Sequence, residues 1–243
     1  MTATPPARAA SRRVAIALDG IGAREALALV DHLGELGVLY KVGPALLLGD
    51  GPAVLEGLRE RGKSIFLDLK FHDIPATVAA AVAEAARAGA ALVTLHAAGG
   101  RAMLRAARDA TPPGGATRLL AVTILTSLDA PALREALGDA AAEPRDAALR
   151  LARLARAEGI DGVVASPLEA RAFRAALGPE ALIVTPGVRG PGSAADDQRR
   201  TLGAREAIAE GADLVVVGRP IVRASAPREA LLGLLAEIEG AAR

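Results

Sequence analysis

The sequence predicts one α/β domain in which eight parallel strands close into a single (β/α)8 TIM barrel. Apolar runs of strand length recur along the 243 residues, and longer Ala-, Leu-, Arg- and Glu-rich stretches with helical periodicity separate them. Gly or Pro marks most of the junctions. Strict alternation of strand and helix is typical of a parallel sheet with right-handed crossovers, and eight such units suit a closed barrel of this length. A doubly wound open sheet is the alternative.

The predicted elements follow one another without a linker or a shift of composition. The strands are expected at Val14–Leu18, Val38–Val42, Ser64–Leu69, Leu92–Leu95, Leu119–Ile124, Gly162–Ala165, Leu182–Val184 and Leu214–Val217. The clearest helical stretches are Ala23–Leu33, Ala53–Arg61, Thr77–Ala88 and Arg145–Ala157. We therefore expect the barrel to occupy residues 13–243. An Ala-, Pro- and Arg-rich disordered tail is expected over residues 1–12, with a transit peptide as the alternative.

Composition excludes several classes of partner and site. The 29 basic and 28 acidic residues give a formal charge of +1, which provides no electrostatic footprint for nucleic acid or an anionic membrane. Aromatic residues make up 2% of the chain, so a platform for stacking bases is missing. No apolar stretch approaches the ~20 residues of a membrane span. The absence of cysteine excludes disulfides, thiolate metal sites and a cysteine nucleophile, and it fits a cytoplasmic protein.

Polar or conformationally special residues stand where the predicted strands end. In a (β/α)8 barrel the carboxyl ends of all strands share one face, and that face carries the chemistry. The sequence therefore predicts a functional site there. In chain order the residues are Asp19, Lys41, Asp68 with Lys70, His96, Thr126, Ser166, Pro186 and Gly218 with Arg219.

The segment Asp68-Leu-Lys-Phe-His-Asp73 concentrates charge at one strand end. Residues two apart on a strand share a face, so Asp68 and Lys70 are expected side by side, with Asp73 just beyond. We expect them to cluster with Asp19 and Lys41 at the mouth of the first three strands. A structural ion-pair network is the alternative, although such a network carries a desolvation cost that apolar packing avoids.

A lysine flanked by carboxylates is favoured as an ammonium and is a poor Schiff-base nucleophile. The chemistry open to Lys70 is to stabilise a developing carbanion and to give it a proton. Asp68 and Asp73 would repel a substrate carboxylate that is about to leave as CO2. Three histidines scattered along the chain do not favour a transition-metal site, so we expect no metal ion.

The last predicted strand, Leu214–Val217, runs into Gly218 and Arg219. Glycine lets backbone amides approach an anion and arginine supplies a planar charged fork, so this end is expected to bind phosphate. The long segment 185–200 carries Arg189 and Gln198, and its glycines would let it close over a ligand. A solvated surface loop is the alternative for this segment.

The segment Gly57–Ser64 fits the nucleotide-binding pattern GxxxxGK[ST]. That mechanism needs a strand before the loop and a helix after it. Here a helix is predicted before the segment and a strand after it, so we interpret the match as chance.

Taken together, these segments resemble the orotidine 5′-phosphate decarboxylase family, in its type 1 bacterial form. The resemblance covers nearly the whole chain after Arg13, and its most specific part is Asp-x-Lys-x-x-Asp-Ile-Pro. The matching segments, in the family's order, are Ala17–Asp19, Tyr40–Gly43, Phe66–Pro75 with Thr77, Val122–Ser127, Thr185–Arg189, Asp197–Gln198 and Val217–Arg219.

The resemblance implies a carboxy-lyase of de novo pyrimidine biosynthesis that converts orotidine 5′-phosphate to UMP and CO2 without cofactor or metal. Lys70 would protonate a C6 carbanion, Asp68 would face the leaving carboxylate, and Lys41 and Asp19 would bind ribose hydroxyls and order the network. A homodimer is implied, because Asp73, Ile74 and Thr77 would enter the site from the second subunit. The remaining substrate-binding residues would be Thr126 for the pyrimidine, Pro186 in the following loop, and Arg189, Gln198, Gly218 and Arg219 for the phosphate.

One departure and two rival functions remain. The family often has Gly-Asp before the glutamine of the long loop, where this chain has Asp196-Asp197, which leaves the path of that loop least certain. The first rival is a Mg²⁺-dependent sugar-phosphate lyase of the same superfamily. The second is a catalytically silent phosphate-binding barrel.

Overall fold

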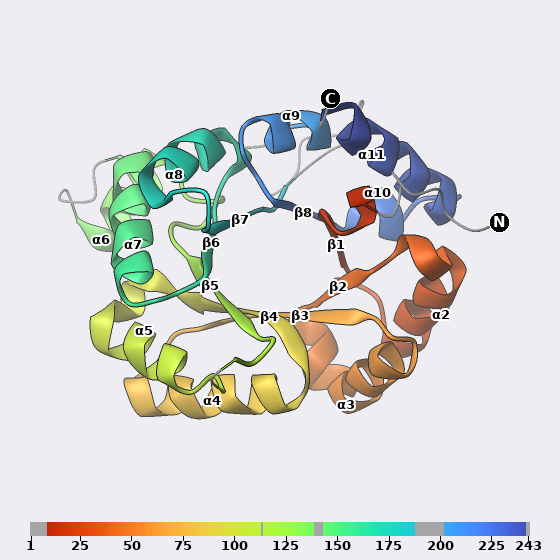
Figure 1. Ribbon diagram of the computed structural model, residues 1–243, viewed down its shortest axis with the longest axis horizontal. Coiled ribbons are helices and arrows are strands. Elements are labelled where there is room, and N and C mark those ends of the chain that lie inside the picture. The colour runs from red at the N-terminus through yellow and green to blue at the C-terminus, as the bar shows by residue number, and fades with distance from the viewer. Residues whose placement is uncertain (1–8, 113, 139–142, 188–201, 242–243) are drawn as a thin grey trace.

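The computed structural model describes residues 9–112, 114–138, 143–187 and 202–241. Within these residues, eight parallel strands pair in chain order and β8 pairs with β1, which closes the predicted (β/α)8 barrel and excludes the open sheet. Figure 1 looks down the barrel, with the strands in the centre and the helices around them. The strands are β1 (Val14–Ala17), β2 (Leu39–Val42), β3 (Ser64–Phe71), β4 (Ala90–His96), β5 (Arg118–Val122), β6 (Gly162–Val164), β7 (Leu182–Thr185) and β8 (Leu214–Val217).

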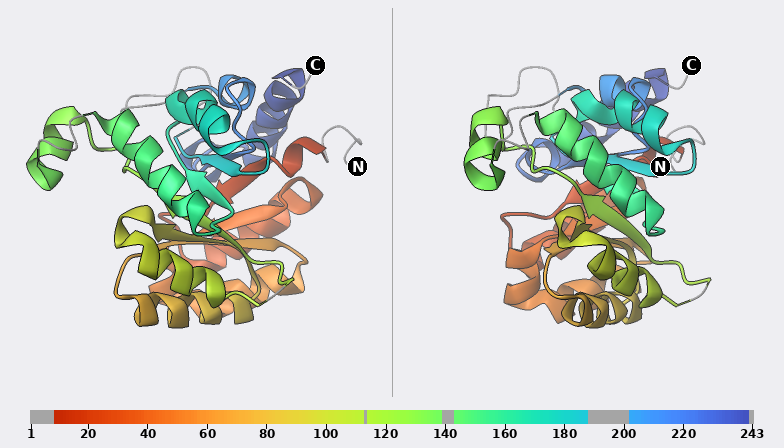
Figure 2. Two further views of the ribbon diagram at one scale, coloured as in Figure 1. Left: turned by 60° about the vertical axis from the view of Figure 1, so that its left-hand side comes forward. Right: turned by 90° about the vertical axis from the view of Figure 1, so that its left-hand side faces the viewer.

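The helices cover the outside of the barrel, and α6 lies at the edge of the molecule in both turned views of Figure 2. No described helix combines the length and the apolarity that crossing a membrane requires. The helices are α2 (Ala23–Leu33), α3 (Pro44–Glu60), α4 (Pro75–Arg87), α5 (Gly100–Asp109), α6 (Ala130–Leu137), α7 (Pro144–Ala157), α8 (Ala170–Leu177), α9 (Ala204–Ala209), α10 (Arg219–Val222) and α11 (Pro227–Ala241), with 3-10 turns η1 (Gly34–Leu36), η2 (Ala97–Gly99) and η4 (Pro167–Glu169).

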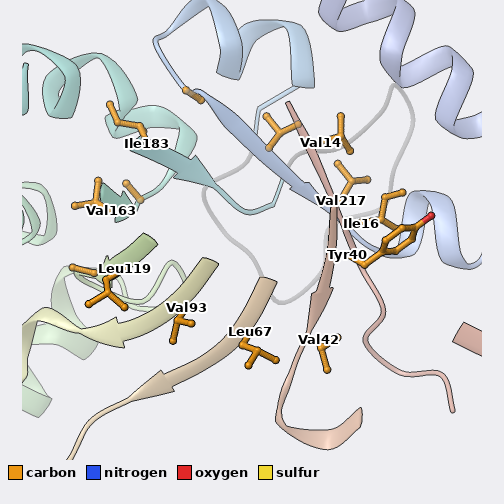
Figure 3. Packing of buried hydrophobic residues seen from close by; sticks show 14 of the residues in the cluster. Val14, Ile16, Tyr40, Val42, Leu67, Val93, Leu119, Val163, Ile183 and Val217 are labelled. Carbon is orange, nitrogen blue, oxygen red and sulfur yellow. The ribbon is translucent and has the colours of Figure 1, made fainter. Parts of the chain in front are cut away.

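Two apolar layers hold the fold, because successive strand residues point to opposite faces. One layer lies between strands and helices, where α2 buries Ala26, Val30 and Leu33 at helical spacing. Figure 3 shows side chains that the strands contribute to this layer, among them Val93 and Ile183. The other layer fills the barrel interior, and its members all come from strands: Ala15, Ala17, Leu39, Phe66, Leu92, Leu120, Val184, Leu214 and Val216.

Strand β3 departs from a regular ladder where it approaches the mouth. Leu67 pairs with Val93 and Phe71 pairs with Leu95, so four steps along β3 match two steps along β4. Within this bulge Lys70 has φ +50°, a left-handed backbone that no other described non-glycine residue adopts. The strand reaches Phe71, two residues beyond its predicted end. Asp68 and Lys70 lie in the bulge, where β3 does not pair regularly with β4.

The structure differs from the expected tail at its last residues. Residues 9–11 are helical, Ala10 and Ser11 are buried, and the Arg13 amide donates to the Ala10 carbonyl at 2.9 Å. The ordered chain therefore begins before Arg13, while residues 1–8 lie outside the described part.

The chance nucleotide-binding match has a packing explanation. Gly57 lies in α3 and Ser64 begins β3, so helix and strand stand in the reverse of the required order, as predicted. A Cβ at Gly57 would lie 2.7 Å from the methyl groups of Leu27 in α2. This glycine therefore lets two helices pack closely.

Candidate active site

Four predicted charged residues join in one network at the carboxyl end of the barrel. Asp68 Oδ1 lies 2.9 Å from Lys70 Nζ, and Asp68 Oδ2 lies 3.2 Å from Lys41 Nζ. Lys41 Nζ also donates to Asp19 Oδ2 at 2.7 Å. The charges alternate in sign from Asp19 to Lys70, so each ammonium has at least one carboxylate partner. The predicted clustering of these four residues is confirmed.

Strand alternation explains why they meet. Ala17, Leu39 and Phe66 fill the barrel interior on β1, β2 and β3. Residues two positions further along each strand keep the same face and lie one layer closer to the mouth. Those positions are Asp19, Lys41 and Asp68, so the network is the polar layer on top of the apolar interior.

Gly43 leaves room for this layer at the end of β2. A Cβ at this position would lie 2.6 Å from Asp19 Oδ1 and 3.8 Å from Lys41 Nζ. A larger side chain would therefore push the Asp19 carboxylate away from the lysine that it binds. The glycine is needed for space, since its backbone is extended.

The two lysines differ in their access to solvent. The side chain of Lys41 is 9% exposed and holds two carboxylates, whereas that of Lys70 is 38% exposed and holds one. Lys41 thus compensates buried negative charge inside the network. Lys70 presents its ammonium at the open side, where a ligand can reach it.

Asp68 is held as a carboxylate. Burial alone would raise its pKa, but the charges of Lys41 and Lys70 and the hydrogen bonds from Lys70 and Thr94 outweigh burial and lower the pKa of Asp68. A permanent negative charge therefore lies beside the exposed ammonium of Lys70.

Thr94 on β4 belongs to the network and was missed by the sequence analysis. Its side chain is fully buried, its hydroxyl donates to Asp68 Oδ1 at 2.9 Å, and it accepts the Lys70 amide at 2.9 Å. A threonine inside an apolar run reads as an ordinary β-branched strand residue. The available signal was its spacing, because Thr94 is two residues beyond the interior Leu92.

Two histidines lie beside the network at the ends of β3 and β4. The rings of His72 and His96 have centroids 5.2 Å apart and planes tilted by 31°. Burial, followed by repulsion from His72 and Lys70, lowers the pKa of His96 despite the attraction of Asp68. His96 is therefore neutral at neutral pH.

Comparisons with known proteins decide the family. Residues 12–233 match the family described as "Orotidine 5'-phosphate decarboxylase / HUMPS family". The chain belongs to this family. It is 47% identical over 227 residues to the orotidine 5'-phosphate decarboxylase of Nitrosospira multiformis, covering 93% of this chain and 94% of that protein. It is 51% identical over 202 residues to that of Anaeromyxobacter dehalogenans, covering 83% and 87%.

A solved structure shows the same architecture. The crystal structure of orotidine 5'-phosphate decarboxylase from Lactobacillus acidophilus superposes with a TM-score of 0.81 at 36% identity, covering 93% of this chain and 99% of that chain. The predicted resemblance to the orotidine 5′-phosphate decarboxylase family and the predicted barrel are therefore both confirmed.

The other predicted residues of this decarboxylase family do not all join the network. Within the described part of the chain, Asp73 forms no ion pair with Lys41 or Lys70, so the single chain joins four of the five residues expected in the cluster. Its carboxylate instead accepts the amide of Ile74 at 2.6 Å, since it lies beyond the strand in a local turn. Asp73, Ile74 and Thr77 are all exposed at the start of α4.

The residues expected around base and phosphate lie on the loops that follow later strands. Thr126 is half-buried in the turn after β5, and Pro186 is half-buried after β7. Gly218 precedes α10, and Arg219 is the exposed first residue of that helix. Arg189 and Gln198 lie outside the described residues. In the described ranges, no three His, Asp or Glu side chains form a group that could hold a metal ion.

Proposed function

We propose that this chain decarboxylates orotidine 5′-phosphate to UMP and CO2, as a step of pyrimidine biosynthesis, without cofactor or metal. The observation that carries the proposal is the Asp19–Lys41–Asp68–Lys70 network at the carboxyl end of a barrel of this family. The network pairs a buried carboxylate with a solvent-accessible ammonium, which are the two groups that the reaction needs.

The proposed chemistry begins when the bond between C6 and the carboxylate breaks. CO2 leaves, the electron pair stays on C6, and the Lys70 ammonium gives its proton to that carbon, so that UMP forms and Lys70 is left as an amine to be reprotonated from solvent. The ammonium also stabilises the developing carbanion before the transfer. Lys41 holds Asp68 from its other oxygen, and this contact keeps the carboxylate in place during the reaction.

The Asp68 carboxylate would lie against the substrate carboxylate in the bound state and would be relieved of repulsion as CO2 departs. Two unit charges ~4 Å apart at an effective dielectric of ~20 interact by about 4 kcal/mol. Enzymes lower barriers by ~8–23 kcal/mol, so repulsion supplies part of the effect and carbanion stabilisation must supply more.

The remaining residues bind the substrate away from the reacting carbon. Asp19 and Lys41 bind ribose hydroxyls, and Thr126 binds the pyrimidine beside Pro186. Arg189, Gln198, Gly218 and Arg219 bind the phosphate, and closure of segment 185–200 lets phosphate binding energy act at C6.

We further propose a cytoplasmic homodimer in which Asp73, Ile74 and Thr77 complete the site of the other subunit. Two features support the dimer. Ile74 is 66% exposed, which is unusual for a large apolar side chain. Asp73 makes no contact with the lysines of its own described chain, so its charge is available to a neighbour.

One assay tests the proposed function. The purified protein is incubated with orotidine 5′-phosphate and EDTA, and the loss of orotate absorbance is followed. Rapid turnover in EDTA supports the proposal. Turnover of a sugar phosphate that requires Mg²⁺ would indicate the lyase, and binding of orotidine 5′-phosphate without turnover would indicate a silent barrel.

A further inference from the structure

The hydroxyl of Thr94 connects the backbone of Lys70 to the side chain of Asp68. The Lys70 amide donates to Thr94 Oγ1 at 2.9 Å, and Thr94 Oγ1 lies 2.9 Å from Asp68 Oδ1. An ionised carboxylate only accepts hydrogen bonds, so the hydroxyl proton must point at Asp68. The direction of both hydrogen bonds is therefore determined.

The bulge in β3 explains why a side chain is needed here. The regular pairs Leu67–Val93 and Phe71–Leu95 leave the intervening residues of β3 without matching partners on β4. A buried amide without a partner is costly, so a group other than the ladder has to accept the Lys70 amide. Thr94 stands between the two regular pairs and supplies that acceptor.

The same contact opposes the backbone strain at Lys70. A left-handed conformation at φ +50° is unfavourable for lysine and persists only where its surroundings hold it. The hydrogen bond from the Lys70 amide acts on that backbone directly. The Thr94 hydroxyl also binds Asp68 Oδ1, and the same oxygen accepts a hydrogen bond from Lys70 Nζ at 2.9 Å. Thr94 thus contacts the Lys70 backbone directly and is linked to the Lys70 ammonium through Asp68.

We propose that Thr94 is a positioning residue, whose hydroxyl holds the Lys70 backbone in its left-handed bulge and so aims the ammonium at the reacting carbon. This inference rests on the proposed function for the identity of the reaction. Thr94 does not touch substrate in this arrangement; it acts through Lys70 and Asp68.

Threonine variants of matched shape test the proposal. Thr94→Val removes only the hydroxyl, and Thr94→Ser keeps it. We expect Thr94→Val to lower kcat by ~100-fold, because small displacements of a reacting group have effects of that size, with KM changed by less than ~3-fold. Thr94→Ser is expected to stay within ~3-fold of wild-type kcat, since both hydrogen bonds remain.

Thr123→Val is the matched control. Thr123 is buried like Thr94, but it lies two positions beyond Ala121, which faces the helices, and its hydroxyl has no partner within the described chain. We expect its kcat within ~2-fold of wild type, since removing an unpaired hydroxyl breaks no contact. Should Thr94→Val fail to fold, Thr94→Cys replaces the hydroxyl by a weak thiol donor and is expected to lose ~10-fold in kcat.

A readout without substrate separates this inference from the proposed function. Hydrogen exchange of the Lys70 amide is measured by NMR in wild type, Thr94→Val and Thr94→Ser. Slow exchange in wild type and Thr94→Ser, with fast exchange in Thr94→Val, supports the contact even if orotidine 5′-phosphate is not the substrate. Unchanged exchange in Thr94→Val overturns it. An equal loss of kcat in the Val and Ser variants also overturns it, because the hydroxyl would then not be the active feature.

Discussion

The two ends of β3 each carry a lysine, and the two lysines are used differently. At the amino end, Lys63 Nζ donates to the carbonyls of Gly34 and Gly37 at 2.6 and 2.8 Å. At the carboxyl end, Lys70 Nζ binds the carboxylate of Asp68. Burial lowers the pKa of Lys63 despite the attraction of Glu35 and Asp31, whereas Asp68 directly compensates the charge of Lys70.

This difference separates a lysine that stabilises the fold from the lysine that we propose to be reactive, at opposite ends of one strand. Lys63 closes the loop around η1 by satisfying carbonyls at the end of a short helix. Lys70 instead takes part in a charged layer that contributes little to packing and requires a strained backbone. Under the proposed function, the amino end of the strand contributes stability and the carboxyl end carries the chemistry.

Exchanging each lysine for alanine tests this comparison most directly. Lys70→Ala is expected to lower kcat by ~10⁴-fold, the upper range for loss of a general acid, and to change the free energy of unfolding by less than ~2 kcal/mol. Lys63→Ala should destabilise by about 2 kcal/mol through its two lost hydrogen bonds and keep wild-type kcat. Steady-state kinetics and urea unfolding measure both. Wild-type activity of Lys70→Ala would show that Lys70 is not the proton donor.

The carboxyl end should also depend on a second subunit. Asp68→Asn and Asp73→Asn are each expected to be nearly inactive, and mixing them should restore about a quarter of wild-type activity, because half of the dimers would be mixed and each would hold one intact site. The assay is decarboxylation after subunit exchange shown by mass spectrometry. No recovery after proven exchange would mean that each subunit holds a complete site.

Gly43→Ala tests whether the contact between Asp19 and Lys41 at the carboxyl end of the barrel is needed for activity. The added Cβ would lie 2.6 Å from Asp19 Oδ1, so we expect displacement of Asp19 and a loss of ~10-fold in kcat/KM. Gly22→Ala is the control, because a Cβ there meets no atom within 4 Å. Equal activity of the two variants would show that the Asp19–Lys41 contact is dispensable.

Low pH should change the contributions of Asp68 and Lys63 to the free energy of unfolding differently, and this effect is the smallest of the four. The pKa of Asp68 is lowered in the folded chain, so its ionised form contributes stability that is complete above its unfolded pKa of ~4 and is lost as pH falls through the folded pKa. The difference in unfolding free energy between wild type and Asp68→Asn should therefore be constant above about pH 5 and should narrow below about pH 4. The difference between wild type and Lys63→Ala should narrow less, because Lys63 Nζ contacts carbonyls and is attracted by Glu35 and Asp31 only from a distance.

The fold could be predicted from the sequence because the alternation of strand and helix patterns is repeated eight times. Each strand is a short apolar run, each helix has a 3.6-residue period, and eight repetitions leave few alternatives. The four-residue network was predicted from the polar residues at the strand ends, because the carboxyl ends of all strands of a barrel share one face.

The missed features depend on contacts between strands. The bulge at Lys70 contains no glycine from which a left-handed backbone could have been predicted. The sequence therefore predicted the end of β3 two residues before its observed end. The spacing of Thr94 from Leu92 could be read from the sequence, but its contacts with Lys70 and Asp68 depend on the register of β3 against β4. The place of Asp73 in the cluster stays a prediction, because within the single chain its carboxylate accepts the Ile74 amide and the expected site belongs to a second subunit.

The left-handed backbone of Lys70 implies a trade-off at the heart of the molecule. Glycine adopts that conformation freely, so Lys70→Gly would relieve about 1 kcal/mol of strain while removing the ammonium that we propose as the proton donor. Selection for thermal robustness alone would therefore favour an inert barrel at this position. On the proposed mechanism, the lysine is therefore kept at a cost in stability to the fold that holds it.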